Sequence, residues 1–320
     1  LPNDHVMANQ AVVDWLGRQY DWSISPDWIV WTPGVVPAFN VACKALCQPG
    51  DKVLIQTPNY PPLIAAPKLN NLIKVDIGSV EVDGRWTIDL DELEKQAADP
   101  ACKLFIMCNP MNPIGSVLTS QELERIADIC ISNNVMLCSD EIHCDIILDE
   151  NAKHIPAGKL AGFKGEAITL MAASKTFNVA GLGTSFAIIE DPATRHKFNL
   201  AAKAMVPWVT VLGLTATQAA FTQCDDWHQA FLRYLRGNRD YLATEIAKIS
   251  ALKLLPPQAT FLAWIDASGL GVENPQKHFE DLGVGPSPGA DFGDKNCVRI
   301  NFGCPRSELE RAIELIKAGC

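Results

Sequence analysis

The fold of this chain is decided by one stretch, Ala172-Ala173-Ser174-Lys175-Thr176-Phe177-Asn178-Val179-Ala180-Gly181-Leu182. An apolar run over 167–171 precedes it and indicates a buried strand, so Lys175 lies at a strand end. Two interpretations of Lys175 are open on local sequence alone: a solvated loop lysine, or a lysine that forms a Schiff base with an aldehyde cofactor. In the second, an apolar pocket lowers the pKa of the amine, which can then form an imine and later act as a base.

Length and composition indicate an ordinary globular protein. The chain has 320 residues, 48% hydrophobic content and a formal net charge of −10. This length allows one large or two moderate domains with a sizeable core. The net negative charge and the lack of a Lys/Arg stripe argue against a nucleic-acid partner. The sequence has no apolar run of about 18 residues, so it predicts no membrane span. We expect a cytoplasmic protein. The chain begins at Leu1 without a methionine, which either a removed signal peptide or excision from a longer polypeptide would explain, and we favour excision.

The cysteines indicate a reducing compartment. Their number, 11, is odd, and no Cys-x-x-Cys pair or zinc-finger spacing occurs. Cys43 and Cys47 lie one helical turn apart in an apolar, alanine-rich sequence, so we interpret them as buried core thiols. We therefore predict no structural disulfides and no metal.

Strands alternate with helices from residue 29 to 190, which predicts a mostly parallel sheet covered by helices on both faces. Seven strands are expected, at 29–32, 53–56, 72–77, 103–108, 135–139, 167–173 and 184–189. Helices are expected at 6–20, 36–47, 90–98 and up to about residue 132, the last opened by a capping box of Thr119 and Glu122. The fold class is α/β.

A second, smaller domain follows a bridging helix. The stretch 192–248 is rich in helix, and the helix over 227–249 is the expected bridge. Strands at 253–255, 260–267 and 298–302, with helices at 275–282 and 307–318, suit a smaller sheet with one exposed face. We predict a large domain over 1–222 and a small domain over 223–320.

Loops that follow five of the predicted strands carry Gly34, Tyr60, Asn112, Asp140 and Lys175. Ligands of parallel sheets bind beyond the carboxyl ends of the strands, and all five residues lie at such ends. Each loop has an ordinary structural explanation by itself. Five loops that meet at one edge of a sheet indicate a ligand site.

Two of these loops suit particular contacts. Gly34 allows a tight turn that leaves the amides of Val35 and Val36 free at a helix N-terminus, where a phosphate can bind. Prolines make 57–62 a rigid loop rather than a helix or strand. This loop presents Tyr60 either as a packed aromatic side chain or as a flat platform under a cofactor ring.

Two further loops carry polar side chains. The loop 109–115 contains two Asn-Pro pairs, of which the second begins at Asn112, and a turn is its ordinary explanation. Asp140, Glu141 and His143 directly follow an apolar strand. Such groups are costly to bury unless they pair or bind something.

Together these residues match what pyridoxal phosphate requires of a protein. Lys175 supplies the imine, Asp140 keeps the ring nitrogen protonated and Asn112 donates to the phenolic oxygen. Tyr60 supplies the ring platform, and the amides after Gly34 hold the phosphate. The protonated ring is the electron sink that stabilises a carbanion.

An amino-acid substrate also needs its carboxylate fixed, which a guanidinium does with two parallel hydrogen bonds. Arg299 lies inside the predicted strand 298–302, where an arginine faces either a ligand or, on an edge strand, the solvent. We interpret Arg299 as the carboxylate-binding residue and Arg306, at the start of the last helix, as structural.

Six motifs carry a family resemblance: TPGVVP at 32–37, TPNYP at 57–61, CNPMNPIG at 108–115, SDEIHCD at 139–145, SKTFNVAGL at 174–182 and RINFGCPR at 299–306. In this order they resemble the MalY/PatB group of cystathionine β-lyase-like carbon–sulfur lyases. That group belongs to the fold-type I, aspartate-aminotransferase superfamily, which implies a large domain with a seven-stranded sheet and a smaller α+β domain. The resemblance covers residues 10 to 318.

The resemblance also implies a role for each residue at a matching position. It implies that Lys175 carries pyridoxal phosphate as a Schiff base, with Lys175 and Tyr60 as the catalytic residues. The implied cofactor-binding residues are Val35, Val36, Tyr60, Asn112, Asp140, His143, Ser174 and Lys175. Of these, His143 lies near the phenolic oxygen or behind the residues that touch it, and Ser174 helps to hold the phosphate. Arg299 is implied to bind the substrate carboxylate.

Three departures from the family pattern leave substrate choice and dimer architecture open. The family's N-terminal arm, which packs on the partner subunit, has no counterpart here. Gln258-Ala259-Thr260 stands where Glu-Gly-Thr is usual, and the loop before Arg299 is short. We still expect a homodimer, and a domain cut from a multidomain enzyme such as a polyketide assembly line is a further hypothesis.

The implied reaction is β-elimination from a cysteine S-conjugate. Cystathionine, cystine or an S-alkyl cysteine, free or carrier-bound, would yield a thiol, pyruvate and ammonia. An aminotransferase of the same fold is one alternative, and it would depend on a keto-acid acceptor. A regulatory or scaffolding protein that keeps the fold is another, although a binding module has no need for Lys175, Asp140 and Arg299 together.

Overall fold

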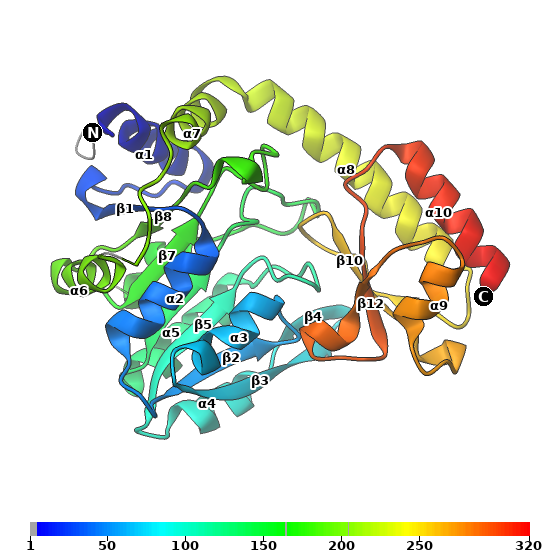
Figure 1. The fold of residues 1–320 in the computed structure, drawn as a ribbon, viewed down its shortest axis with the longest axis horizontal. Coiled ribbons are helices and arrows are strands. Elements are labelled where there is room, and N and C mark those ends of the chain that lie inside the picture. Colours follow the sequence, from blue (N-terminus) through cyan, green and yellow to red (C-terminus); the bar gives the residue numbers. More distant parts are fainter. Residues whose placement is uncertain (1–4, 164, 204) are drawn as a thin grey trace.

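The computed structural model describes residues 5–163, 165–203 and 205–320. Figure 1 shows two sheets on opposite sides of the molecule, with the long helix α8 (Asp225–Ile246) running from the larger one to the smaller one. No helix among the described residues is long and apolar enough to cross a membrane.

The larger sheet has the strand order β1-β8-β7-β6-β5-β2-β3-β4. Its strands are β1 (Ile29–Thr32), β2 (Lys52–Thr57), β3 (Ile73–Val82), β4 (Arg85–Ile88), β5 (Cys102–Cys108), β6 (Met136–Asp140), β7 (Ala167–Met171) and β8 (Ser185–Ile188). From β7 to β3 the neighbouring strands pair in parallel. Strand β8 is antiparallel to both β7 and β1. The seven predicted strands and the mostly parallel sheet are confirmed.

Strand β4 was not predicted. It extends the sheet by one edge strand, because it folds back on the second half of β3 as an antiparallel hairpin. The turn is Asp83–Gly84, and both residues have positive φ, 50° and 74°. An Asp-Gly pair is a strong hairpin signal, and the prediction overlooked it.

Helices cover both faces of this sheet, as predicted. They are α1 (Val6–Tyr20), α2 (Val35–Leu46), α3 (Pro61–Leu69), α4 (Leu90–Ala97), α5 (Ser120–Ser132), α6 (Pro192–Ala202) and α7 (Val211–Gln223). Alternate strand residues face opposite layers: Ile55 packs in the core with α2 and α3, and Leu54 packs in the core with α4 and α5. The capping box of Thr119 and Glu122 at the start of α5 is confirmed.

The prediction of a loop over 57–62 is wrong at its end. Helix α3 begins at Pro61, so Pro61 and Pro62 form its first turn, and Tyr60 is the N-cap. Proline suits this place because the first amides of a helix have no intrahelical acceptor and the ring already fixes a helical φ. The prolines thus start a helix that holds Tyr60 at the sheet edge.

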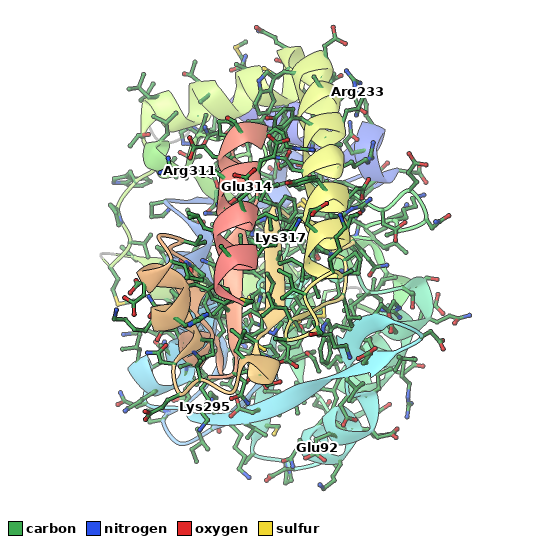
Figure 2. All side chains as sticks on the ribbon, turned by 90° about the vertical axis from the view of Figure 1, so that its right-hand side faces the viewer. Glu92, Arg233, Lys295, Arg311, Glu314 and Lys317 are labelled. Carbon is green, nitrogen blue, oxygen red and sulfur yellow. The ribbon has the colours of Figure 1, made fainter. Side chains whose placement is uncertain are left out.

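The smaller sheet is antiparallel throughout and has the order β11-β12-β10-β9. Its strands are β9 (Lys253–Leu254), β10 (Leu262–Asp266), β11 (Ser287–Pro288) and β12 (Cys297–Asn301), with helices α9 (Pro275–Asp281) and α10 (Arg306–Gly319). Figure 2 shows α8 and α10 side by side, with Arg311, Glu314 and Lys317 labelled along α10. All three side chains are exposed, while Leu309, Ile313 and Ile316 of α10 pack into the core of this domain.

Short 3-10 helices connect these elements: Pro26–Trp28, Ala157–Lys159, Ala161–Phe163, Ala180–Leu182, Ser268–Leu270 and Gly289–Phe292. The two-residue strand β11 was not predicted. Helix α7 ends at Gln223 and helix α8 begins at Asp225. The predicted domain boundary after residue 222 lies close to this connection, and it stays a prediction.

The cysteines are all free thiols. Cys43 and Cys47 are buried in the core with α2, as predicted. Within the part of the chain that the structure describes, no group of three or more His, Cys, Asp or Glu side chains is placed to hold a metal ion.

Candidate active site

Five strands bring the predicted site residues to one edge of the larger sheet. Strands β7, β6, β5 and β2 are parallel, and β1 runs the same way because two antiparallel pairings, through β8, separate it from β7. The loops after these five strands carry the residues singled out in the sequence. The structure therefore places these residues beyond the carboxyl ends of the strands, where sheets of this kind bind ligands.

Lys175 follows β7 in a tight turn. Amide hydrogen bonds close the turn, from Phe177 N to Ala173 O at 2.9 Å and from Val179 N to Ser174 O at 3.0 Å. The Lys175 side chain is partly exposed, whereas Ala173 is buried. The turn thus keeps the Lys175 side chain partly exposed beyond the end of β7 rather than buried in the core.

Asp140 is the last residue of β6 and is buried. Its Oδ1 accepts a hydrogen bond from Ile142 N at 3.1 Å. The pKa of this carboxyl is raised to about 7, mainly by burial; the charge of Glu141 adds to the rise, while the Ile142 bond and the charge of Lys175 oppose it. The carboxylate therefore lacks a full counter-charge, and a cationic group beside it would favour its ionised form.

His143 is buried in the loop that follows Asp140. Burial lowers its pKa to about 3, and the positive charges of Lys175 and Arg299 lower it as well. The imidazole is consequently neutral at physiological pH. Its Nδ1 has no hydrogen-bond partner among the described residues, so this nitrogen is available to a bound group.

Arg299 joins the two domains at the site. From β12 its Nη1 donates to Asn112 Oδ1 at 2.9 Å, and its Nη2 donates to Ser287 Oγ at 3.1 Å. The guanidinium carbon lies 4.5 Å from the centroid of the Phe292 ring. Burial lowers the pKa of Arg299, while the nearby Tyr60 phenol raises it. Contacts with Asn112, Ser287 and Phe292 thus fix the direction of the Arg299 guanidinium, which does not point into the solvent.

Sequence reasoning missed Ser287 and Phe292, which hold Arg299. Ser287 lies opposite Arg299 in the β11–β12 pairing, but β11 is too short to show a strand pattern. By contrast Arg306 is structural, as expected: its Nε donates to Asn238 Oδ1 at 2.8 Å.

The helix α2 offers free amides near its start. Gly34 is the N-cap, and no side chain caps the helix. The expectation of a special turn at Gly34 is wrong, because its φ of 165° is extended backbone. The absence of a side chain matters instead, since the Val35 and Val36 amides stay uncovered at the positive end of the helix dipole.

A second glycine has a clear conformational role. Gly115 has φ 76°, and a Cβ there would lie 2.4 Å from Pro257 Cβ and 2.8 Å from Ala259 O. Only glycine allows the loop with Asn112 to pack this closely on the segment before β10. Gln258 departs from the family pattern, and its side-chain Oε1 accepts a hydrogen bond from Val117 N at 3.2 Å. Gln258 therefore takes part in the contact between the two domains.

The residues present fit pyridoxal phosphate. A primary amine, a buried carboxylate that lacks a full counter-charge and a neutral imidazole with a free nitrogen lie near one another at this edge of the sheet, close enough for the charge of Lys175 to act on both Asp140 and His143. Free amides of α2 suit a phosphate, and the half-buried Tyr60 side chain suits an aromatic ring. The roles of the individual residues remain predictions.

Comparison with known proteins agrees with this fold. Residues 1–316 match the family model for aminotransferase class I and II. Cystathionine β-lyase PatB of Bacillus subtilis (strain 168) is 33% identical over 322 residues, spanning 97% of this chain and 82% of PatB.

Solved structures are also similar. The crystal structure of OvoB superposes with a TM-score of 0.96 at 40% identity, covering 98% of this chain and 83% of that one. A PLP-bound C–S lyase from Staphylococcus hominis, complexed with L-cycloserine, gives a TM-score of 0.92 at 33% identity, covering 98% and 79%. These similarities confirm the predicted fold-type I architecture and the resemblance to the MalY/PatB group.

Asp140 is expected to make stability depend on pH. Its pKa is about 7 in the folded chain against an ordinary 3.8, so the folded state binds the proton more tightly and the free energy of unfolding falls between pH 4 and 7. Asp140→Asn removes this loss. In cofactor-free protein the variant should be more stable at pH 8, by at most about 4 kcal/mol, with the gain vanishing near pH 4.

Urea unfolding across that pH range measures the effect. Asp128→Asn, at an exposed position on α5, is the control and should follow the wild type throughout. A stability difference between Asp140→Asn and wild type that does not change with pH would contradict the burial argument.

Proposed function

The chain belongs to the aminotransferase class I and II family, and from that premise we propose that it is a pyridoxal-phosphate-dependent carbon–sulfur β-lyase. Its substrate is a cysteine S-conjugate such as cystathionine, cystine or an S-alkyl cysteine. The products are a thiol, pyruvate and ammonia. The observation that supports the proposal is that Lys175 and Asp140 follow neighbouring parallel strands at one edge of the sheet, where Arg299 reaches the Asn112 loop, in a chain similar to carbon–sulfur lyases.

The proposed cofactor contacts are those that the family resemblance implies. Lys175 would hold the cofactor covalently through Nζ, and Asp140 would pair with its ring nitrogen. The Val35 and Val36 amides, together with Ser174, would hold the phosphate. Asn112 and His143 would serve the phenolic oxygen, and Tyr60 would pack against the ring. When bound, pyridoxal phosphate supplies an electron sink for negative charge that develops at the substrate Cα.

Three residues of the chain then act on the substrate. Arg299 binds the carboxylate through its two Nη groups, in a direction that Asn112 and Ser287 already fix. Lys175 Nζ would take the proton from the substrate Cα. The ionised Asp140 would favour a positive charge on the ring nitrogen of the cofactor, and this charge is what lets the cofactor act as an electron sink.

The aminotransferase alternative stays in view because the family includes such enzymes. Its products differ: an aminotransferase converts the amino acid only when a keto acid accepts the amino group. An assay without keto acid therefore separates the two.

We predict that purified protein with pyridoxal phosphate forms equimolar pyruvate and thiol from L-cystathionine or an S-alkyl cysteine when no keto acid is present. Lys175→Ala should abolish this turnover because the base at Cα is gone, whereas Lys44→Ala, an exposed lysine on α2, should not change it. Pyruvate and thiol are measured in parallel. Product formation only after a keto acid is added would favour the aminotransferase, and full activity of Lys175→Ala would remove the assignment.

Arg299→Ala should act mainly on substrate binding. Loss of a charge-assisted pair of hydrogen bonds costs about 1.5–3 kcal/mol, so KM should rise roughly 10- to 100-fold with a smaller change in kcat. Arg299→Lys should recover only part of this, because an ammonium lacks the planar fork. Steady-state kinetics measure KM and kcat of these variants. Arg311→Ala, which changes an exposed arginine on α10, is the control. An unchanged KM would contradict the role of Arg299.

A homodimer is part of the proposal. Trp208, which is 80% exposed, and Val6 line a cavity of about 1060 Å³, and Val211 and Leu212 lie exposed just beyond it. Exposed apolar side chains gathered in this way mark an interaction surface. The mass in solution should be twice that of one chain, and Trp208→Glu should give monomers. Leu69→Glu, at an equally exposed apolar site on α3, should stay dimeric; a wild-type monomer would contradict the proposal.

The domain division at residue 222 and a cytoplasmic location also remain parts of the proposal. The location is supported by the 11 cysteines, which are unpaired in the described chain. Membership of a larger multidomain enzyme, and a carrier-bound substrate, remain predictions.

A further inference from the structure

The segment 140–145 has a second polar side that the reaction does not use. Asp140 and His143 lie within reach of the charge of Lys175, while Glu141 and Asp145 are buried with hydrogen-bond partners of their own. A cavity of about 280 Å³ lies behind the segment, lined among others by Asp145 and His154. Burying two carboxylates is costly unless both are hydrogen-bonded, so the partners of Glu141 and Asp145 are needed to keep them in place.

Glu141 is completely buried and fully bonded. Its Oε1 accepts hydrogen bonds from Ser139 Oγ at 2.8 Å and from Ala157 N at 2.9 Å. Its Oε2 lies 2.7 Å from His154 Nε2. Because a carboxylate only accepts, His154 Nε2 is the donor. The side chain of His154 is itself 1% exposed.

These bonds fix the peptide next to Asp140. Glu141 N donates to Leu170 O of β7 at 2.8 Å, and Asp140 O accepts from Asn109 N at 3.0 Å. The backbone is thus held on both edges, and the side chain of Glu141 is held from behind. Ile142 N, the next amide along, donates to Asp140 Oδ1. The direction of the Asp140 carboxylate therefore depends on where Glu141 is anchored.

His154 is the donor to Glu141 whose loss is most costly. If the His154 donor is lost, Glu141 Oε2 becomes a buried carboxylate oxygen without a partner, which is more costly than an unpartnered neutral group. Glu141 can lower that cost by moving toward another donor, and its movement would shift the peptide that carries Asp140.

We propose that His154 is a positioning residue, which acts through Glu141 to aim the Asp140 carboxylate at the bound cofactor. This inference rests on the proposed function, because it takes pyridoxal phosphate as the group that Asp140 faces. It predicts that the cofactor affinity depends on a donor at the Nε2 position of residue 154.

The neighbouring buried groups belong to a separate set of contacts. Asp145 accepts from Trp15 Nε1 at 3.1 Å and from the Tyr20 hydroxyl, and its backbone oxygen lies 2.6 Å from His228 Nε2. Tyr20 also meets the His154 ring edge-on, with centroids 5.5 Å apart. The hydrogen bond of His228 goes to Asp145 rather than to Glu141, so His228 provides a matched buried histidine as control.

The experiment compares two amides at position 154. In His154→Gln the side-chain amide would lie where the histidine Nε2 lies, whereas in His154→Asn the shorter side chain places its amide at the level of Nδ1 and cannot reach Glu141. The dissociation constant of pyridoxal phosphate is measured by equilibrium dialysis of the holoenzyme. We expect His154→Asn to bind the cofactor about tenfold more weakly, and His154→Gln and His228→Gln to stay within about twofold of wild type.

A second background tests the route through Glu141. In Glu141→Gln protein the side chain is neutral, so the loss of the His154 donor costs less. We expect His154→Asn to weaken the cofactor affinity less than threefold there. Equal losses in both backgrounds, or wild-type affinity of His154→Asn, would overturn the inference.

Two other results are distinguishable. If His154→Asn fails to fold, the comparison of His154→Gln with wild type still decides, because a tenfold loss in that variant contradicts the donor argument and retained affinity supports it. If the wild-type chain itself does not bind pyridoxal phosphate, the proposed function falls, and this inference falls with it.

Discussion

A carboxylate that is buried at the end of a strand without a full counter-charge is the constraint on which this site depends. Burial holds the pKa of Asp140 near 7, and the positive charge of Lys175 offsets only part of that effect. Such a group is costly in an apolar core unless a cationic ligand faces it. The buried strands of the parallel sheet and the bonds behind Glu141 are what keep it there.

The same edge of the sheet brings the other groups to Asp140. Five strands end at this edge: β1, β2, β5, β6 and β7. The loops that follow them are far apart in sequence but lie at the same edge of the sheet. The small domain then adds Arg299, held by Asn112 from the other domain and by the ring of Phe292. A substrate carboxylate and a ring nitrogen can thus be recognised by groups that different parts of the fold position independently.

Local patterns were enough to predict the large sheet and the loops of the site. Buried parallel strands read as apolar runs, and Lys175, Asp140 and Asn112 follow such runs directly. Features that depend on tertiary contacts were not predictable in this way. Arg299 and Asn112 are 187 positions apart, and the two-residue strand that places Ser287 has no periodicity. The prolines at 61 and 62 favour a loop when the sequence is considered alone, whereas in the structure they form the first turn of helix α3.

The central claim is that Lys175 carries the cofactor, and one measurement tests it most directly. Borohydride reduction of the holoenzyme, followed by proteolysis and mass spectrometry, locates the lysine to which pyridoxal phosphate is bound. The account predicts one phosphopyridoxyl group per chain, on the peptide that contains Lys175. A label on a different lysine, or no stoichiometric label in protein saturated with the cofactor, would contradict it.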